Sequence, residues 1–209
     1  MADSWIEKEI LKRGFRDIAG VDEAGRGALF GPVVAAAVIL PTCFVISRSP
    51  DWVRELNDSK LLSPSKRKRL AGCLFSYSPS IGIGLATNAE IDRQNIYWAS
   101  LTAMRRAVEK MPVKPGFLLV DGFPLNGVHY PQIALKQGDR KSLTIAAASI
   151  IAKVVRDEMM VLLDRVFEGY ALSKNKGYGT KDHFRALKDK GPTAFHRMSF
   201  HLGLGKNVL

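Results

Sequence analysis

The segment from Lys141 to about Phe167 constrains the fold more than any other part of the sequence. Its apolar residues recur in alternating steps of three and four, which places them on one face of a helix. They are Ile145, Ala148, Ala152, Val155, Met159, Leu162 and Val166. Small residues near the start of the segment would let the helix lie close to a sheet. We therefore predict one long helix with a continuous apolar stripe that packs against strands.

Shorter segments have the composition of strands, because they are apolar or alternate apolar with small residues between turn-forming positions. They are residues 17–23, 32–40, 81–87, 116–122 and 132–136. Further helices are predicted after Ser63, which precedes a proline, after the capping box of Thr87 and Glu90, and over residues 181–189. The mixture predicts an α/β or α+β fold with a mixed sheet.

The composition changes beyond residue 168, where Gly, Lys, His and aromatic residues become frequent. We interpret residues 1–167 as a catalytic core. Residues 168–209 would form a small helical cap laid against that core and contributing to substrate binding. The two parts together are predicted to make one compact unit.

The net charge narrows the class of partner. The 209 residues include 31 Lys and Arg against 20 Asp and Glu, a formal net charge of +11. Such an excess attracts nucleic acids or anionic membrane surfaces, although on charge alone a basic protein with neither partner fits equally well. The longest apolar run, Val33 to Leu40, is about half of what a bilayer span requires, so we expect no membrane association.

The cysteines and the N-terminus favour a cytoplasmic protein. Cys43 and Cys73 cannot form a disulfide framework and have no metal-ligand spacing, which suits a reducing compartment. Residues 1–14 mix acidic with basic side chains and contain no continuous apolar run, unlike a secretory signal. We expect a monomer.

Four acidic residues follow strands or precede a helix. Asp22 and Glu23 end an apolar strand, Asp121 ends another, and Asp139 lies just before the long helix. Strand ends and helix starts tend to meet at one edge of a mixed sheet, so these carboxylates are predicted to converge. Taken singly, Asp139 could simply favour the positive end of the helix, and Asp121 could belong to a turn. Adjacent Asp22 and Glu23 point to opposite faces of a regular strand, so a shared site requires a kink or a backbone carbonyl.

Converging carboxylates repel one another unless a cation neutralises them. Mg²⁺ and Mn²⁺ prefer oxygen ligands, and two such ions about 4 Å apart would suit phosphodiester hydrolysis. The chain lacks the motifs of three other kinds of site. It has no P-loop for nucleotides, no serine in a nucleophile-elbow context and no zinc-ligand spacing among its histidines.

Two loops have residues suited to nucleic acid. In the turn Gly25–Gly31, the glycines Gly25 and Gly27 let backbone groups approach a ligand, and Arg26 can meet a phosphate. A plain tight turn would use glycine too. The stretch 174–180 places Tyr178 between glycines and beside lysines, as in a stacking platform, although a mobile basic loop has the same composition.

Taken in order, these segments resemble type 2 ribonuclease H (ribonuclease HII). The matching stretches are GVDEAGRG with GPVVAAAVIL, NDSKLLS, LLVDG, KQGDRKSLTIAAASIIAKVVRDE, NKGYGT and HRMSF, which extend from residue 18 to 200. The resemblance implies a ribonuclease H-like α/β fold, a mixed five-stranded sheet flanked by helices, with a helical C-terminal part. It also implies an endonuclease that hydrolyses the RNA strand of RNA–DNA hybrids and incises duplex DNA 5′ of an embedded ribonucleotide.

The resemblance also implies roles for individual residues. Asp22, Glu23, Asp121 and Asp139 match the family's four active-site acids, which bind two Mg²⁺ or Mn²⁺ ions. Gly25, Arg26 and Gly27 match the element that contacts the ribose 2′-OH, and Tyr178 matches the tyrosine that packs against the sugar at the RNA–DNA junction. Lys60, Ser149 and Lys153 fall where the family places phosphate-facing or site-supporting groups. The products would carry 3′-hydroxyl and 5′-phosphate ends.

This chain departs from the family pattern at three positions outside the expected metal ligands. Ala28 and Phe30 stand where relatives more often have proline and alanine, and Asn175 stands where histidine is usual. We expect these residues to change loop rigidity or substrate contact. The rival hypotheses are another nuclease of the same fold, such as a junction resolvase or transposase, and a non-catalytic nucleic-acid-binding protein.

Overall fold

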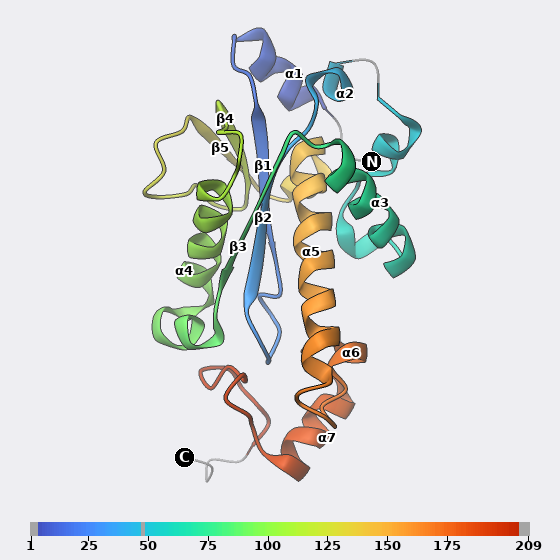
Figure 1. Cartoon of the computed structure of the whole chain (residues 1–209). Helices are drawn as coiled ribbons and strands as arrows, with labels where there is room; N and C mark the ends of the chain where they lie inside the picture. The colour runs from blue at the N-terminus through green and yellow to red at the C-terminus, as the bar shows by residue number, and fades with distance from the viewer. Residues whose placement is uncertain (1–3, 47–48, 205–209) are drawn as a thin grey trace.

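The computed structural model describes residues 4–46 and 49–204, and its centre is a five-stranded sheet with the strand order β3-β2-β1-β4-β5 (Figure 1). The strands are β1 (Ile18–Ala24), β2 (Val33–Ile39), β3 (Ser80–Ala86), β4 (Phe117–Asp121) and β5 (Gln132–Leu135). β2 pairs antiparallel with both β1 and β3, whereas β4 pairs parallel with both β1 and β5. The predicted mixed sheet is confirmed, and so are all the predicted strands to within one or two residues at each end.

Helices cover both faces of the sheet, with α4 on one face and α5 and α3 on the other (Figure 1). The helices are α1 (Trp5–Lys12), α2 (Thr42–Ile46), α3 (Pro64–Tyr77), α4 (Asn88–Glu109), α5 (Leu143–Asp164), α6 (Leu172–Asn175) and α7 (Lys181–Lys190). Three short 3-10 helices, η1 (Asp51–Glu55), η2 (Ser59–Leu61) and η3 (Gly138–Arg140), lie in the connections. No helix among the described residues is long and apolar enough to cross a membrane.

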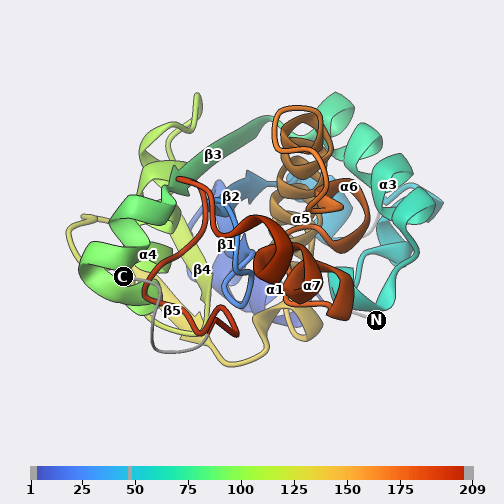
Figure 2. The same ribbon diagram turned by 90° about the horizontal axis from the view of Figure 1, so that it is seen from below.

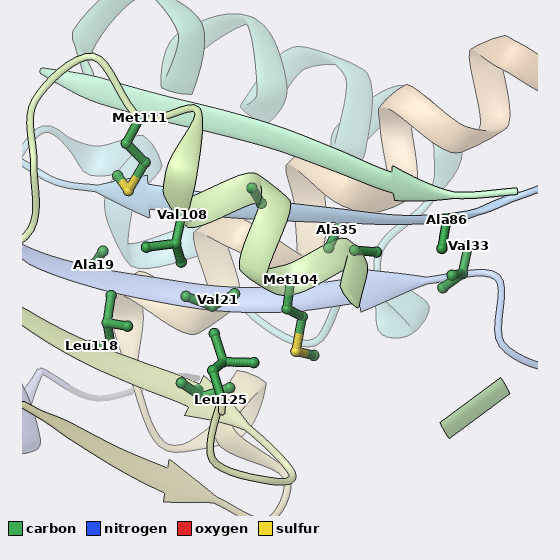
Figure 3. Close-up of a cluster of buried hydrophobic side chains, with 14 of the residues drawn as sticks. Ala19, Val21, Val33, Ala35, Ala86, Met104, Val108, Met111, Leu118 and Leu125 are labelled. Atoms are coloured by element: carbon green, nitrogen blue, oxygen red, sulfur yellow. The ribbon is translucent and has the colours of Figure 1, made fainter. Parts of the chain in front are cut away.

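The close packing of α4 on the sheet explains why β3 contains two glycines. A Cβ atom at Gly82 or Gly84 would overlap a backbone carbonyl of α4, so these glycines let the helix lie directly on the strand. Side chains of α4 such as Met104 and Val108 fill the space over β1 and β4 (Figure 3). The Thr87–Glu90 capping box that begins this helix is present as predicted.

The first half of α5 is buried against the other face. Every residue from Leu143 to Ala152 is buried, and a Cβ at Gly20 of β1 would overlap the backbone of Thr144. The small residues of this segment therefore do what the sequence predicts. The helix begins at Leu143 rather than Lys141 because η3 ends at Arg140 and Ser142 caps the helix, its Oγ accepting from the Ile145 amide.

The prediction of one continuous apolar stripe along α5 is wrong for its second half. The side chains of Leu162 and Val166 are 61% and 71% exposed, whereas Arg156 and Met160 are fully buried. The cause is that α5 runs past the end of the sheet. There it packs against residues 168–204, the C-terminal segment (Figure 1). A different face of the helix is therefore buried beyond the sheet than on it.

The C-terminal segment joins the two helical layers at one end of the sheet. After α7 the chain crosses beneath the strands from the α5 side to the α4 side (Figure 2). There, Asn88 Nδ2 donates to the Ala194 carbonyl at 2.8 Å, and the Asp92 carboxylate accepts from the amides of Met198 and Ser199. The boundary at residues 167 and 168 stays an interpretation, and residues 1–3 and 205–209 of these parts lie outside the described residues.

Candidate active site

Two of the predicted acids lie where neighbouring parallel strands separate. The β1–β4 ladder ends at the pair Val21 and Val120, so the next step of the same register would bring Asp22 opposite Asp121. Asp22 is only 6% exposed, and its Oδ1 accepts the Glu23 amide at 2.7 Å. Asp22 and Glu23 both line the same cleft although they are adjacent in the strand, and the charge of Asp121 acts on both carboxyl groups. The end of the ladder therefore opens the edge at which these carboxylates gather.

The turn after β5 brings the fourth acid to this edge. Oδ1 of Asp121 accepts a hydrogen bond from the Gly138 amide at 2.6 Å, at the start of η3. Asp139 is the next residue and is 8% exposed. The carboxylate of Asp121 thus fixes the backbone that carries Asp139. This explains how two acids far apart in the sequence share one site.

These residues line a cleft of about 560 Å³. Every residue predicted for the site lies on it: Asp22, Glu23, Gly25, Arg26, Gly27, Lys60, Asp121, Asp139, Ser149, Lys153 and Tyr178. Ala24, Ser59 and Arg67 also line it and were not predicted. Segments that are distant in sequence therefore meet around one acidic centre with a basic rim.

Burial and mutual repulsion raise the pKa values of three of the acids. For Asp22, burial raises the pKa well above its ordinary value, and the charges of Glu23 and Asp121 raise it further. For Glu23, burial again raises the pKa and Asp121 adds to the shift, although Arg26, 3.3 Å from Oε1, opposes it. The protein by itself therefore holds these carboxylates in an electrostatically costly arrangement.

Asp139 shows the same behaviour beside a fifth acid, Asp58, that the sequence reasoning missed. Burial raises the pKa of Asp139, followed by the charges of Asp58 and Asp121. Burial also acts to raise the pKa of Asp58, but hydrogen bonds from the Lys60 amide and the Arg140 guanidinium outweigh it and leave the pKa lowered. Asp58 is therefore a charged neighbour of Asp139. The sequence contains one weak sign of Asp58, since an aspartate two residues before Lys60 can cap a short helix. Its pairing with Arg140, 82 positions away, has no local sign in the sequence.

The donor set fits hard divalent cations. All four predicted ligands are carboxylates, and Oε2 of Glu23 is buried without a hydrogen-bond partner. No three Asp, Glu, His or Cys side chains among the described residues already form a group that could hold an ion. Mg²⁺ is commonly bound by one or two carboxylates together with substrate phosphates rather than by a closed protein cage, which this open arrangement matches.

Two buried arginines hold the turn Gly25–Gly31, called the glycine loop from here on. Neither of them was predicted from the sequence. Arg156 of α5 donates to the carbonyls of Phe30, Pro32 and Lys176 at 2.8–3.1 Å. Arg197 donates to the carbonyls of Arg26 and Gly31 at 2.7 and 2.9 Å. Burial lowers the pKa of Arg197 to about 9, which leaves its guanidinium charged at neutral pH. The loop that carries Gly25–Gly27 is therefore held from beneath by two cations on its carbonyl oxygens.

Tyr178 joins the glycine loop through the backbone. It forms an isolated β-bridge with Ala28, and the Leu29 amide donates to the Gly177 carbonyl at 2.8 Å. Lys153 Nζ and Arg156 Cζ each lie 5.3 Å from the centre of the Tyr178 ring. The Tyr178 ring therefore lies at the cleft within reach of two cations of α5.

The remaining predicted residues lie on the wall formed by α5 and η2. Ser149 Oγ bonds to Ser59 Oγ at 2.8 Å, and Lys153 pairs with Asp157 at 2.7 Å. A second groove of about 390 Å³ adjoins the cleft, because Arg67 and Lys153 line both. Its cationic lining residues are Arg67, Lys68, Lys153, Lys174 and Lys176. Asp157 and Glu158 line the groove as well and pair with Arg67, Lys68 and Lys153, so its cations without a partner inside the groove are Lys174 and Lys176.

Two of the departures from the family pattern support the structure around these loops. Phe30 is fully buried, and its ring lies 4.9–5.9 Å from the rings of Phe167, Phe195 and His196. Asn175 donates to the Tyr170 carbonyl and accepts from the Gly177 amide. Phe30 thus packs the glycine loop against the C-terminal segment, and Asn175 fixes the backbone of residues 170–177 that leads to Tyr178.

Comparisons with known proteins identify the family and the fold of the chain. A family model described as Ribonuclease HII matches residues 19–202. A curated relative from Moorella thermoacetica, named Ribonuclease HII, is 50% identical over 194 residues, which are 93% of this chain and 91% of the relative. The crystal structure of ribonuclease H2 from Pyrococcus horikoshii OT3 superposes with a TM-score of 0.72 at 25% identity, covering 88% of this chain and 94% of that one. Bst-RNase HIII in complex with Mn²⁺ shares the fold, with a TM-score of 0.63 at 21% identity over 88% of this chain and 67% of that one.

Proposed function

The chain belongs to the ribonuclease HII family, and on that premise we propose which residues of the cleft perform its reaction and on which substrates. Membership makes the protein a ribonuclease H, a divalent-metal-dependent endonuclease acting on RNA–DNA hybrids. The finer proposal is that it cuts the RNA strand of hybrids and also incises duplex DNA on the 5′ side of a single ribonucleotide. The observation that carries it is the convergence of the four acids, the glycine loop and Tyr178 on one cleft.

We assign the metal site to Asp22, Glu23, Asp121 and Asp139, with two Mg²⁺ or Mn²⁺ ions held jointly with the substrate. The ions would supply a water made nucleophilic at neutral pH and stabilisation of the leaving 3′ oxygen, giving 3′-hydroxyl and 5′-phosphate ends. The carboxylates themselves bind and orient. Ion binding requires the ionised carboxylates, and the pKa values of Asp22, Glu23 and Asp139 are raised, so ion affinity should fall as the pH is lowered.

Recognition of the ribonucleotide is assigned to the rim of the cleft. Gly25, Arg26 and Gly27 would contact the 2′-OH, the group that distinguishes RNA from DNA at a given nucleotide. Tyr178 would pack against the sugar at the RNA–DNA junction. Because Arg156 and Arg197 hold the carbonyls of these loops, the recognising groups are preorganised before the substrate arrives.

Phosphate contacts are assigned to the basic side of the cleft. Lys60 and Lys153 line it and would face phosphates, whereas Ser149 supports the wall through Ser59. We place the protein in the cytoplasm as a monomer, which suits its two free cysteines, Cys43 and Cys73.

The test uses a DNA duplex that contains one ribonucleotide. Wild type, Asp121→Asn and the exposed-site control Asp51→Asn are each incubated with Mg²⁺, Mn²⁺ or EDTA. We expect metal-dependent incision 5′ of the ribonucleotide by wild type and Asp51→Asn, and a rate at least about a thousandfold lower for Asp121→Asn, because a metal ligand is lost.

The same assay separates the rival functions. Tight duplex binding that ignores EDTA, without incision in any metal, would favour a non-catalytic nucleic-acid-binding protein. Cleavage of an all-DNA junction would favour a resolvase or transposase of the same fold. Full activity in Asp121→Asn would overturn the assignment of the metal site.

A further inference from the structure

A buried pair of histidines, His183 and His196, has no role in the assignments above, and neither residue lines the cleft. His183 belongs to α7, and His196 lies in the segment that crosses beneath the sheet (Figure 2). Their side chains are 0% and 1% exposed, and their Nε2 atoms are 3.1 Å apart. Burial lowers the pKa of both, that of His196 to about 4 with His183 adding to the shift. Both rings are therefore neutral at neutral pH.

The hydrogen bonds of a neutral pair fix the position of each proton. The Thr193 amide, which can only donate, lies 2.9 Å from Nδ1 of His196, so this nitrogen accepts and the ring proton is on Nε2. Nε2–H of His196 then donates to Nε2 of His183. The ring proton of His183 must be on Nδ1, from which it donates to the Tyr178 carbonyl at 3.0 Å. The four groups form one hydrogen-bonded chain with a single direction.

The chain ends at the residue whose ring lies on the rim of the cleft. The carbonyl of Tyr178 also accepts from the Thr180 amide at 2.8 Å, and its backbone is bridged to Ala28. His196 contributes a second constraint, since its backbone is bridged to Phe30 in the same glycine loop. The pair thus connects both recognition loops, the glycine loop and the Tyr178 loop, to one buried set of hydrogen bonds.

The pair is arranged to hold backbone rather than to bind a ligand. Each of the four ring nitrogens already has a hydrogen-bond partner, and the two Nε2 atoms face each other. Aromatic rings of Tyr170 and Phe30 lie against His196 at 5.1 and 4.9 Å between ring centres. There is accordingly no free nitrogen for a metal or for proton transfer to the cleft.

We propose that His183 and His196 are positioning residues for substrate recognition, which set the place of Tyr178 at the sugar through the directional chain from Thr193 to the Tyr178 carbonyl. The proposal rests on the proposed function of Tyr178. It predicts that losing the last donor of the chain, to the Tyr178 carbonyl, weakens substrate binding and leaves the hydrolytic step, performed by the carboxylates, nearly unchanged.

Two substitutions of His183 separate positioning from simple packing. His183→Phe keeps a ring of similar size but removes the donor to the Tyr178 carbonyl. His183→Asn places an amide Nδ2 near the position of Nδ1 and so retains that donor while giving up the ring. If packing alone mattered, phenylalanine would be the better replacement.

The kinetic readout is KM and kcat on the duplex with one ribonucleotide. For His183→Phe we expect KM to rise about five- to tenfold, the effect of about one lost hydrogen bond, with kcat within about twofold of wild type. For His183→Asn we expect KM within about threefold of wild type. An unchanged KM in His183→Phe, or a KM in His183→Asn as high as in His183→Phe, would overturn the proposal.

A second readout does not depend on cleavage. In ¹⁵N-labelled wild type, NMR of the imidazole nitrogens should show His183 protonated at Nδ1 and His196 at Nε2, and His183→Phe should shift the Gly177 and Tyr178 amide signals. Other tautomers, or unshifted amides, would contradict the chain even if the enzyme were active. Absence of cleavage by wild type with the expected tautomers would instead contradict the proposed function and leave the hydrogen-bonded chain established.

Discussion

Gly25 lies where the chain leaves β1 and turns over a buried arginine. Its φ of +98° is in the region that favours glycine, and a Cβ there would overlap the guanidinium of Arg156. Gly27, two residues later, has no atom within 4 Å of the position of an added Cβ. The fold therefore requires glycine at position 25. At position 27 only a contact with the substrate would require it.

Substitution of Gly25 gives a prediction for which substitution of Gly27 is the control. Gly25→Ala should lower the free energy of unfolding by about 2 kcal/mol or more, from backbone strain and overpacking against Arg156. Gly27→Ala should leave the melting temperature within about 1–2 °C of wild type, because a ΔΔG below about 0.5 kcal/mol is expected at an open site. Thermal unfolding of the two variants checks this. Equal destabilisation by both would show that the Arg156 contact does not decide the conformation of the loop.

The clustered acids predict a stability that depends on pH and metal. A carboxyl whose pKa is raised by folding, such as Asp22, keeps its proton in the folded state above about pH 4, where the unfolded chain has lost it. Its favourable contribution is complete below about pH 4 and is lost as the pH rises through the raised pKa. The metal-free protein is therefore less stable at neutral pH than it would be without this carboxyl.

Asp22→Asn should remove this penalty because asparagine keeps the oxygen that accepts the Glu23 amide but carries no charge. We expect its melting temperature in EDTA at pH 7.5 to exceed that of wild type, by about 2–4 °C for each kcal/mol gained. Added Mg²⁺ or Mn²⁺ should stabilise wild type more than the variant. Thermal unfolding with and without metal tests both statements, with Asp51→Asn as control, and a variant less stable than wild type in EDTA would refute them.

At the scale of elements, α1 is attached to the active-site end of α5 by one carboxylate. Glu7 is fully buried, and its Oε1 accepts from Ser142 Oγ at 2.7 Å and from the amide and Oγ1 of Thr144 at 2.9 and 3.1 Å. These residues form the first turn of α5, which directly follows η3 and Asp139. An N-terminal helix thus holds the helix start beside a predicted metal ligand.

Glu7→Ala should therefore affect more than α1. Removing the acceptor leaves buried donors of Ser142 and Thr144 unsatisfied, so we expect a loss of about 2–4 kcal/mol in the free energy of unfolding. Glu9→Ala on the same helix removes only the exposed pair with Lys12 and should cost less than about 0.5 kcal/mol. Chemical denaturation measures both, and similar small losses would show that α1 docks without Glu7.

The elements themselves show what the sequence could predict. The strand ends with Asp22 and Asp121, the glycines of β3 and the capping box of α4 are local patterns, and the structure has each of them. The second half of α5 was predicted wrongly because its buried face is chosen by the C-terminal segment, whose position the local pattern does not contain. The same limit applies to Arg156 and Arg197, whose acceptors lie up to 126 and 171 positions away.

For the molecule as a whole, the acidic centre lies within a strongly basic protein. The net charge of +11 is large, but the groove beyond Lys153 concentrates part of it, with Lys174 and Lys176 on its rim. If this groove follows the duplex backbone, its lysines displace counterions from phosphates, whereas lysines elsewhere contribute only a long-range field. Position rather than total charge should then decide how binding responds to salt.

Two double variants with the same change in charge test this, both made in Asp121→Asn so that the duplex stays intact. Lys174→Gln with Lys176→Gln should reduce the slope of log K against log salt concentration by about 2, close to 0.9 for each lost phosphate contact. Lys8→Gln with Lys12→Gln, on α1 and outside both the cleft and the groove, should change the slope by less than about 0.5. Fluorescence anisotropy of a labelled hybrid from 50 to 300 mM salt gives both slopes. Equal reductions would mean that duplex binding depends on net charge alone and that the groove is not its track.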